Sequence, residues 1–530
     1  MFKGDFKLVT HLARLSKKSI NWVKILYFGS TEFTHKLKFS MAKYKNCNYD
    51  QMIMVPVCLK DQLLPGTLEY TIHTLIEERV DMSIFDDNYN NDDTGCPAYD
   101  PKIMFKIILF GYARGLTTSR KLEKACRENI IFMALTCGQA PDHSTIATFI
   151  PAVKAQIMPM FQDILLFCDE LGLLGGTTFS ADGLKLPSNA SKDKSGTIEQ
   201  LDQKKQRLEK RLAELMDEHI ENDAKVQKAK QLEKRIETLN EFLHDNEPKI
   251  NSRGKEIKSN VTDNDSSLMM TSHGVIQGYN AQAIVDSKHQ IVMFPDAGTS
   301  GQDNEHLALL IEGAKDNLVA IGKDDECLKQ VNMLADANYL SPTNVEKLQD
   351  EQINGYIPDT DFRKRDPRLI QGDPKFSLAD FYYNEDDDVY TCPAGETLTR
   401  QPDSTRNGKK YYRHYAAEET KCSSCSVRHR CLAKKTSKRR YLSVYYDKKI
   451  AAYAHDMMSK LDTEEGRKIY DQRLGMVEPV FANIRVQKRM DRFWRRGKDK
   501  INIEWILYCM VHNIEKCIQY CRKPALSPAI

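Results

Sequence analysis

The first third of the chain carries the apolar pattern of packed helices. Residues 65–170 read as helical, and Met104–Tyr112 is apolar almost throughout. Thr118–Glu123 forms a polar entry into a further helix, while Pro141–Thr145 breaks the pattern before an apolar stretch resumes. The pattern predicts a small helical domain. A helix-turn-helix type of DNA binding is one interpretation, although most helical bundles bind no DNA.

From Leu173 onward the periodicity changes to that of strands. Thr177–Gly183 is predicted as a short strand that ends in Asp182 and a turn glycine. Gly278–Asp286 alternates with period two and is followed by a partner strand across a polar turn. A helical stretch at His306–Leu318 precedes a strand that ends at Asp336. Strands followed by alternating strand and helix favour an α/β domain with a mixed sheet.

Two insertions interrupt this domain. In Ile198–Phe242 the leucines step by sevens, fours and threes between Lys and Glu, which predicts an antiparallel helical hairpin with a bend at His219–Asn222. The hairpin is either a solvated spacer or a partner-binding or dimerising arm. The second insertion, Asp359–Thr463, is polar and is expected to be rich in loops, and Tyr470–Lys523 is helical by pattern.

Composition places the chain among ordinary globular proteins. Its 530 residues include 77 Lys+Arg and 74 Asp+Glu, for a net charge of +3, with 41% hydrophobic and 28% charged residues. Wholesale disorder, a collagen repeat and a disulfide miniprotein are therefore excluded. No run of about 18 apolar residues occurs, so no membrane-spanning helix is expected. Residues 1–40 form a basic extension, either a nucleic-acid-binding arm or a poorly ordered start ahead of Met41.

Four of the 14 cysteines cluster, whereas ten are scattered as expected for reduced cytosolic thiols. The cluster has the spacing C-x29-C-x2-C-x5-C, formed by Cys392, Cys422, Cys425 and Cys431. Four thiolates would close a tetrahedral structural Zn²⁺ site, and unrelated free thiols are the alternative. A catalytic zinc is disfavoured because four thiolates leave no open position. The basic stretch Lys421–Arg440 beside it suits either DNA backbone contact or a solvated loop.

Two aspartates occupy positions at which catalytic or ligand-binding residues are common. Asp182 and Asp336 each follow a predicted strand, at the sheet edge where ligands collect in α/β proteins. Taken singly, each is more commonly a turn or cap residue. Brought together, two carboxylates repel, which favours a shared proton or a divalent cation. Mg²⁺ takes carboxylate oxygens and commonly serves phosphate chemistry.

Several blocks in order resemble the DDE transposases of bacterial insertion sequences. The blocks are Ser180–Lys185, Asp263–Ser266 with Gly278–Gln282, Ala335–Tyr339 and Val477–Phe481, and the resemblance runs from about Met41 to Lys516. It implies an RNase H-like core preceded by a helical DNA-binding domain, with Asp182, Asp336 and Glu478 as the metal-binding triad. Two Mg²⁺ (or Mn²⁺) ions in such a site would activate the attacking hydroxyl and stabilise the leaving oxygen.

The resemblance also assigns basic and aromatic residues around Glu478. Tyr470, Arg473 and Arg485 fit the tyrosine, arginine and basic positions of the family, although four residues separate Arg473 from Glu478 where three are commonest. Arg485 would share a helix face with Glu478. Pro479 predicts that the helix begins or kinks at Glu478. Further DNA phosphate contacts are expected at Lys185, Lys488 and Arg489.

These observations predict a DNA transposase that cleaves element ends and joins them to target DNA. The domains expected are a basic extension at 1–40, a helical DNA-binding domain at 41–170, and a catalytic domain at 171–530 with insertions at 198–245 and 359–463. The partners expected are double-stranded DNA and further copies of the chain, as a homodimer or higher multimer in the bacterial cytoplasm, associated with the nucleoid. A domesticated Mg²⁺-dependent nuclease and a non-catalytic zinc-containing DNA-binding protein are the alternatives.

Overall fold

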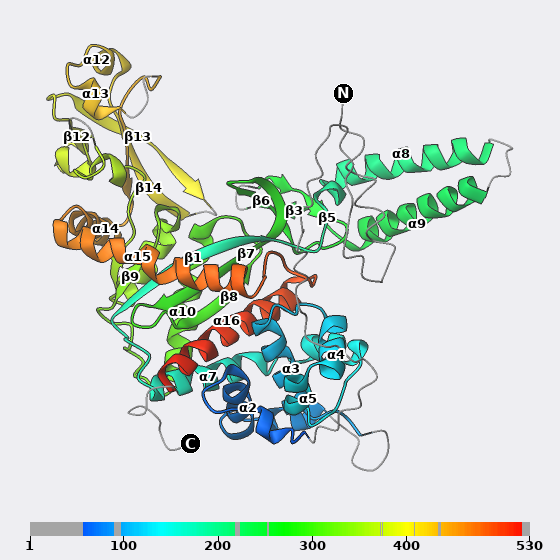
Figure 1. Cartoon of the computed structure of the whole chain (residues 1–530). Helices are drawn as coiled ribbons and strands as arrows, with labels where there is room; N and C mark the ends of the chain where they lie inside the picture. Colours follow the sequence, from blue (N-terminus) through cyan, green and yellow to red (C-terminus); the bar gives the residue numbers. More distant parts are fainter. Residues whose placement is uncertain are drawn as a thin grey trace, which may run out of the picture. The chain divides into compact units, whose positions relative to one another are not determined.

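The computed structural model describes residues 57–88, 97–217, 223–251, 254–370, 373, 375–406, 409–432 and 436–521 (Figure 1). The chain divides into two units, Met1–Val57 and Cys58–Ile530, and all described residues except Val57 lie in the second. The basic extension at 1–40 and the bend expected at His219–Asn222 lie outside the described residues. No helix among the described residues is both long and apolar enough to cross a membrane.

The helical region predicted for residues 65–170 is confirmed. Its helices are α2 (Leu68–Glu78), α3 (Pro101–Ala113), α4 (Ser119–Glu128), α5 (Ile130–Leu135), α6 (His143–Ala152) and α7 (Ile157–Glu170). Short polar side chains cap some of their N-termini. Thr118 caps α4 at the polar entry predicted there, and Asp142 accepts from the backbone N–H groups of Ser144 and Thr145 at the start of α6. α3 is buried along ten consecutive residues, which explains its apolar sequence.

A mixed sheet of six strands follows. Its strands are β1 (Thr178–Pro187), β6 (Ser267–Thr271), β7 (Gly274–Asp286), β8 (Val292–Gly298), β9 (Asn332–Leu334) and β10 (Asn354–Tyr356). The order is β10-β9-β1-β7, and β8 and β6 pair with different stretches of β7. β1, β7 and β8 are antiparallel, whereas β9 and β10 run parallel to β1. The mixed α/β fold and the helical region before it agree with the RNase H-like core expected from the sequence.

The strand that carries Asp182 is longer than predicted. β1 does not end at Asp182 and Gly183 but continues to Pro187, because β7 pairs with it from Phe179 to Pro187. Gly183 is therefore a strand residue rather than a turn glycine. A Cβ there would lie 2.0 Å from Nε2 of Gln282, so the glycine makes room for the Gln282 side chain.

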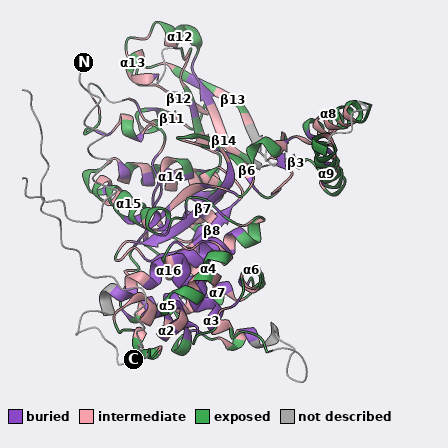
Figure 2. Cartoon of the chain, turned by 45° about the vertical axis from the view of Figure 1, so that its right-hand side comes forward, coloured by how far each residue is buried: buried purple, intermediate pink, exposed green. Residues whose placement is uncertain are grey.

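The strand predicted at Gly278–Asp286 and its antiparallel partner are confirmed as β7 and β8, but the burial of β7 does not alternate. All residues from Gln277 to Asp286 are buried, because helices pack against the sheet. These helices are α10 (Leu307–Ala320), α11 (Pro342–Asp350), α14 (Lys448–Leu461), α15 (Glu464–Ala482) and α16 (Lys498–Cys521). Figure 2 shows the buried residues concentrated in the sheet and in α16.

Helix α16 joins the sheet to the helical region. It packs against β8 and also against α2, α3, α6 and α7. Asn513 accepts from the N–H of Val292 at 2.8 Å and donates to its carbonyl at 2.9 Å, so the helix satisfies backbone groups of β8. One continuous hydrophobic core therefore includes both the helical region and the sheet.

The first insertion is a helical hairpin, as predicted. α8 (Ile198–Asp217) and α9 (Asp223–Asp245) run side by side (Figure 1). Leu201, Leu239 and Phe242 form a small core of their own at the base. Short two-residue pairings accompany it: β2 (Ser195–Gly196) with β5 (Ser259–Asn260), and β3 (Lys249–Ile250) with β4 (Glu256–Ile257).

The second insertion is a sheet rather than the loop-rich segment expected. Its five antiparallel strands are β11 (Tyr382–Asn384), β12 (Val389–Thr391), β13 (Thr397–Arg406), β14 (Lys409–Ala416) and β15 (Tyr441–Tyr445), with two short helices, α12 (Glu419–Ser423) and α13 (Arg428–Cys431). The insertion has a separate core around Tyr390, Leu398, Tyr415 and Leu442. Its short strands are rich in Tyr and Thr, which have high strand propensity but raise the apparent polarity.

Candidate active site

Asp182 and Asp336 lie where the parallel part of the sheet ends. The last pair of the β1–β9 ladder is Ser180 with Leu334, and each acid follows its member of that pair by two residues. Arg473 interacts electrostatically with both carboxylates, and Asp336 acts on the pKa of Asp182. The chain thus brings together two acids that are 154 residues apart in sequence.

Asp336 also has a local role. It is the N-cap of the one-turn helix Ala337–Tyr339, where its carboxylate accepts from the backbone N–H of Asn338 at 2.8 Å and from the Asn338 side chain at 3.2 Å. The cap interpretation of this residue is therefore confirmed. The cap also fixes the carboxylate at the end of β9.

Asp182 is held by one charged and one neutral donor. Arg473 Nη1 donates to Asp182 Oδ2 at 3.0 Å, and the backbone N–H of Gly183 donates to Oδ1 at 2.8 Å. Burial raises the pKa of Asp182, and the nearby Asp336 adds to this, although Arg473 and the Gly183 N–H favour the ionised form. For Arg473, burial lowers the pKa, but Asp182, Tyr470 and Asp336 outweigh it and leave the pKa above its ordinary value. Arg473 is thus the local counter-charge of the two acids.

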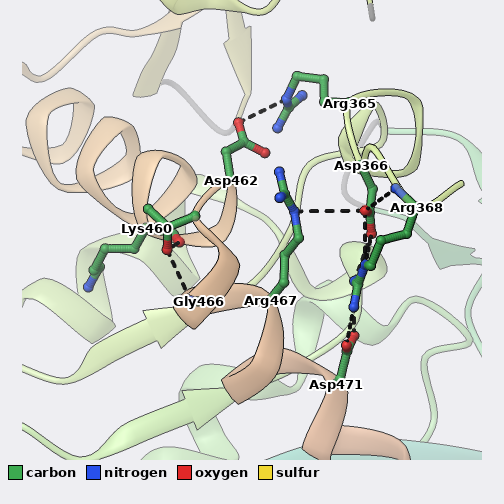
Figure 3. Close-up of polar contacts among 9 residues, drawn as sticks. Arg365, Asp366, Arg368, Lys460, Asp462, Gly466, Arg467 and Asp471 are labelled. Atoms are coloured by element: carbon green, nitrogen blue, oxygen red, sulfur yellow. Dashed lines mark hydrogen bonds and ion pairs between the residues drawn. The ribbon is translucent and has the colours of Figure 1, made fainter. Parts of the chain in front are cut away.

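Helix α15, which carries Arg473, is fixed at its start by a network of charges (Figure 3). Arg368 binds the buried carboxylate of Asp366 and reaches Asp471 on α15 at 2.5 Å. Arg365 bridges Asp359 and Asp462, just ahead of the helix. Helix α15 is therefore tied to the loop that follows β10, and it packs against β1.

Tyr470 packs one turn before Arg473. Its ring meets Phe362 edge-on at a centroid distance of 5.5 Å. Burial raises the pKa of Tyr470, while the adjacent Arg473 lowers it and Asp336 raises it. Tyr470 therefore lies in the same cluster as the two acids and Arg473.

The helix does not begin at Glu478, because α15 starts at Glu464 and continues through Pro479 to Ala482. Proline lacks the N–H that would bond the carbonyl of Gly475, one turn earlier. Gln290, in the turn between β7 and β8, supplies the missing donor: its Nε2 lies 2.9 Å from the Gly475 oxygen. A tertiary contact thus stabilises a proline inside the helix. Arg473 consequently belongs to the same helix as Glu478.

Glu478 and Arg485 are exposed. Glu478 lies five positions after Arg473 along the helix, which at about 3.6 residues per turn places the two side chains about 140° apart around the axis. Arg485 lies in the π-helical turn Asn483–Gln487 that extends α15. Among the residues that the structure describes, no three His, Cys, Asp or Glu side chains are arranged to hold a metal ion.

A polar network that sequence reasoning missed adjoins the acids. Asp303, in a helical turn after β8, accepts from Asn280 at 2.7 Å and from Gln282 at 3.1 Å and lies 3.7 Å from Lys185 Nζ. Gln282 in turn accepts a hydrogen bond from the buried Tyr339 hydroxyl. Residues Gly278–Gln282 belong to one of the blocks that resemble the transposase family. The sequence does not show which side chains they bond, and only the fold reveals the contacts with Asp303 and Tyr339. Lys185 is thus held at an acid beside the site.

Lys488 and Arg489 differ in environment. The Lys488 side chain is 0% exposed and pairs with Glu515 at 2.6 Å, so it links α15 to α16 rather than facing solvent as a phosphate contact would. Burial lowers its pKa, and Glu515 opposes this shift. Arg489 is exposed, and its stem lies over Gly115, between α3 and α4.

The four clustered cysteines meet in one pocket of the second insertion. All four line it, together with Phe376 and Leu398 from the insertion core. Burial raises the pKa of Cys431, and the other three thiols act on it in the same direction, whereas Arg440 opposes them. Two arginines from the described part of the basic stretch beside them are engaged internally. Arg428 donates to the carbonyls of Cys422 and Ser437, and the Arg440 guanidinium lies over the Phe381 ring.

Two family models match the chain. One described as "Transposase DDE domain" matches residues 391–518, and one described as "Transposase domain (DUF772)" matches residues 57–151. No curated protein and no solved structure matches it. The first match contains Arg473, Glu478 and the four cysteines, and the second covers the helical region, whereas Asp182 and Asp336 lie between them. The chain therefore resembles the DDE transposases of insertion sequences, and its matched domains indicate a transposase.

Proposed function

We propose that the protein binds the ends of a mobile DNA element and catalyses metal-dependent strand cleavage and strand transfer. The observation that carries the proposal is the pairing of Asp182 and Asp336 beside Arg473, on an α/β sheet preceded by a helical region matched as a transposase domain. Paired carboxylates at a sheet edge suit a hard divalent cation, and the basic residues after Glu478 suit a polyanion.

Asp182, Asp336 and Glu478 would hold two Mg²⁺ or Mn²⁺ ions, which would supply charge for activating the attacking oxygen and stabilising the leaving oxygen. Asp182 and Asp336 fit this role by position and chemistry. Glu478 is the proposed third ligand by its place in the sequence block, and in this structure its side chain is exposed. Arg473 orients Asp182 and offsets the repulsion between the two acids, and Arg485 would contact DNA phosphate.

The test uses the purified full chain, Mg²⁺ and linear DNA that carries the element's terminal repeats. Asp182→Asn and Asp336→Asn are each expected to lower cleavage at least a hundredfold while DNA binding persists. Glu478→Gln should behave likewise, whereas Glu465→Gln, an exposed glutamate on the same helix, should cleave as the wild type does. Unchanged cleavage by Asp182→Asn would overturn the proposal.

The same assay separates the alternatives. Cleavage without a joined product would favour a domesticated nuclease, and DNA binding without any processing by the wild type would favour a non-catalytic DNA-binding protein. A homodimer or larger multimer on paired ends is part of the proposal. Comparing the mass of the protein–DNA complex before and after removal of residues 200–241 tests whether the α8–α9 hairpin contributes to it.

We further propose that Cys392, Cys422, Cys425 and Cys431 bind a structural Zn²⁺ ion. All four line one pocket beside a small core, which supports the proposal; their side chains are not in a metal-holding arrangement in this structure, and four thiolates would have to close on the ion to form a tetrahedral site. The protein purified under reducing conditions should hold one zinc per chain. Cys425→Ser should lose it, while Cys137→Ser, at an exposed lone cysteine, should keep it. Wild-type protein without zinc would contradict the proposal.

A further inference from the structure

The segment Arg492–Gly497, which leads into α16, is bound to the exit of strand β1. The backbone N–H of Phe493 donates to the Pro187 carbonyl at 2.9 Å. Asn189 bonds twice: its side chain donates to the Trp494 carbonyl at 3.1 Å, and its own carbonyl accepts from Arg496 Nε at 2.9 Å. The Phe493 ring is fully buried and meets Tyr279 edge-on. One side of the segment is thus fixed to the strand that carries Asp182.

The other side of the segment is fixed by three acids, of which Glu504 and Asp263 are buried and Asp265 is exposed. The N–H groups of Trp494 and Arg495 donate to Glu504 on α16 at 3.3 and 3.4 Å. The N–H of Gly497 donates to Asp263 at 3.1 Å, and that of Lys498 to Asp265 at 2.8 Å. Because the backbone is ordered before any ligand arrives, binding to this segment costs little conformational entropy.

The side chains left facing solvent are cationic and aromatic. Arg492, Arg496 and Lys498 are exposed, and the indole of Trp494 is 38% exposed. Across the described ranges, no ion pair within 4.0 Å involves any of these three cations. Arg492 also donates to the Ser188 carbonyl at 3.3 Å. Tryptophan is usually well buried, so an exposed indole beside exposed cations that form no close ion pair, on a rigid segment, indicates a binding surface.

We propose that Arg492–Lys498 is a platform for a single-stranded stretch of DNA. The cations contact successive phosphates, and Trp494 stacks on an unpaired base. Stacking requires a free base face, which a duplex hides between neighbouring pairs, so the indole favours unpaired nucleotides. The inference rests on the proposed function for its substrate, and it adds a second DNA contact outside the acid cluster.

The distance along β1 predicts where on the DNA this contact falls. Pro187 is five residues beyond Asp182, which spans about 17 Å at roughly 3.3 Å per residue. The DNA between the acid cluster and the platform is taken as duplex, which advances about 3.4 Å per nucleotide along its axis, with the unpaired nucleotides beginning at the platform. The platform therefore meets DNA about five nucleotides from the phosphate at the acid cluster, on the side toward which β1 runs.

The test measures binding without cleavage, in buffer free of added divalent metal. Fluorescence anisotropy compares a single-stranded 12-mer with a duplex of the same sequence. Trp494→Ala should weaken binding to the single strand about five- to hundredfold, with a much smaller effect on the duplex. Trp494→Phe should restore most of the affinity. The matched control is Tyr382→Ala, which removes an aromatic residue that is 73% exposed on the second insertion.

The predicted position of the platform on the DNA is tested with element-end DNA that has an unpaired strand and carries 2-aminopurine at successive nucleotides. Its fluorescence should be quenched most near the fifth nucleotide from the cleavage point, and Trp494→Ala should abolish that quenching. Arg496→Ala should weaken both DNA forms and reduce the salt dependence of binding by about one phosphate contact. An unchanged melting temperature shows that each variant folds.

Single-strand affinity that is unchanged in Trp494→Ala overturns the platform, as does equal weakening for both DNA forms without quenching. The two proposals fail separately. A chain that does not cleave DNA but loses single-strand affinity in Trp494→Ala refutes the transposase proposal alone, whereas cleavage that depends on Asp182, with Trp494 inert, refutes the platform alone.

Discussion

Asp182 gains its candidate role from one neighbour on each side. The backbone N–H of Gly183, the next residue on β1, donates to the Asp182 carboxylate. From helix α15, the Arg473 guanidinium donates to the same carboxylate at 3.0 Å and supplies a positive charge. The side chains of the pair are 24% and 12% exposed, so water screens them only in part. A change of either residue therefore alters the charge balance of both acids.

Glu504 offers the clearest test of a single buried group. It is fully buried on α16 beneath the platform, and burial raises its pKa to about 7, while Arg495 and the N–H donors of Trp494 and Arg495 oppose the shift. The unfolded chain releases this proton near pH 4.5, whereas the folded chain keeps it to about pH 7. The free energy of unfolding should therefore fall as pH rises through this window, by up to about 3 kcal/mol.

Glu504→Gln removes this titration and keeps one acceptor for the backbone. The variant should gain stability relative to the wild type as pH rises from 5 to 8, measured by urea unfolding at each pH. Burial lowers the pKa of His512 to about 3, which gives an opposite slope between about pH 3 and 6.5, but both proteins carry it equally. A stability difference that does not change with pH would show that Glu504 is already ionised in the fold.

At the scale of elements, α15 depends on a turn that is remote in sequence. Gln290 donates to the carbonyl that Pro479 leaves without a partner, and its oxygen accepts from Lys516 on α16 at 2.7 Å. The β7–β8 turn therefore links α15 and α16. Helix rules that consider only neighbouring residues predict that a helix begins or kinks at Glu478, because they do not include a hydrogen-bond donor from elsewhere in the chain.

A double-mutant cycle tests this link. Gln290→Ala should lower the free energy of unfolding by about 1 kcal/mol, since it removes two hydrogen bonds at a partly buried turn. Pro479→Ala restores the helix N–H, and in that background Gln290→Ala should cost clearly less. Equal costs in both backgrounds, measured by chemical denaturation, would show that Gln290 and Pro479 act independently.

At the scale of the whole molecule, α16 makes the helical region and the sheet one body. Trp505 is fully buried, donates from its indole to the Gln282 carbonyl of β7 at 2.8 Å, and stacks near Phe481 of α15. A few residues further along the helix, Tyr508 stacks on Tyr112 of α3 at 4.7 Å. The C-terminal helix thus contacts both parts, although the helical region precedes the sheet in sequence.

Trp505→Ala should destabilise both parts together by about 3–5 kcal/mol, because it removes a large buried side chain together with its hydrogen bond to β7. Hydrogen exchange should show faster exchange in α3 as well as in β7. Loss of protection confined to β7 would mean that the helical region folds independently of α16.

Much of the fold followed from local patterns. The helices of residues 65–170, the antiparallel pair β7–β8, the α8–α9 hairpin and the polar start of the helix at Thr118 all depend on neighbours within a few residues, which the sequence displays directly. The five-stranded insertion was missed because its Tyr- and Thr-rich strands carry a weak apolar pattern. The true length of β1 was missed because it is set by pairing with β7, about 100 residues away.

The sequence alone determined the order of elements, the resemblance to DDE transposases and the identity of the acids and thiols, because these reside in residue type and spacing. Only the tertiary structure decided which groups meet. It paired Asp182 with Arg473, buried Lys488 against Glu515, joined Asp303 to Gln282, and fixed Trp494 at the exit of β1. Contacts of this kind depend on strand register and helix packing across hundreds of residues, which no local pattern encodes.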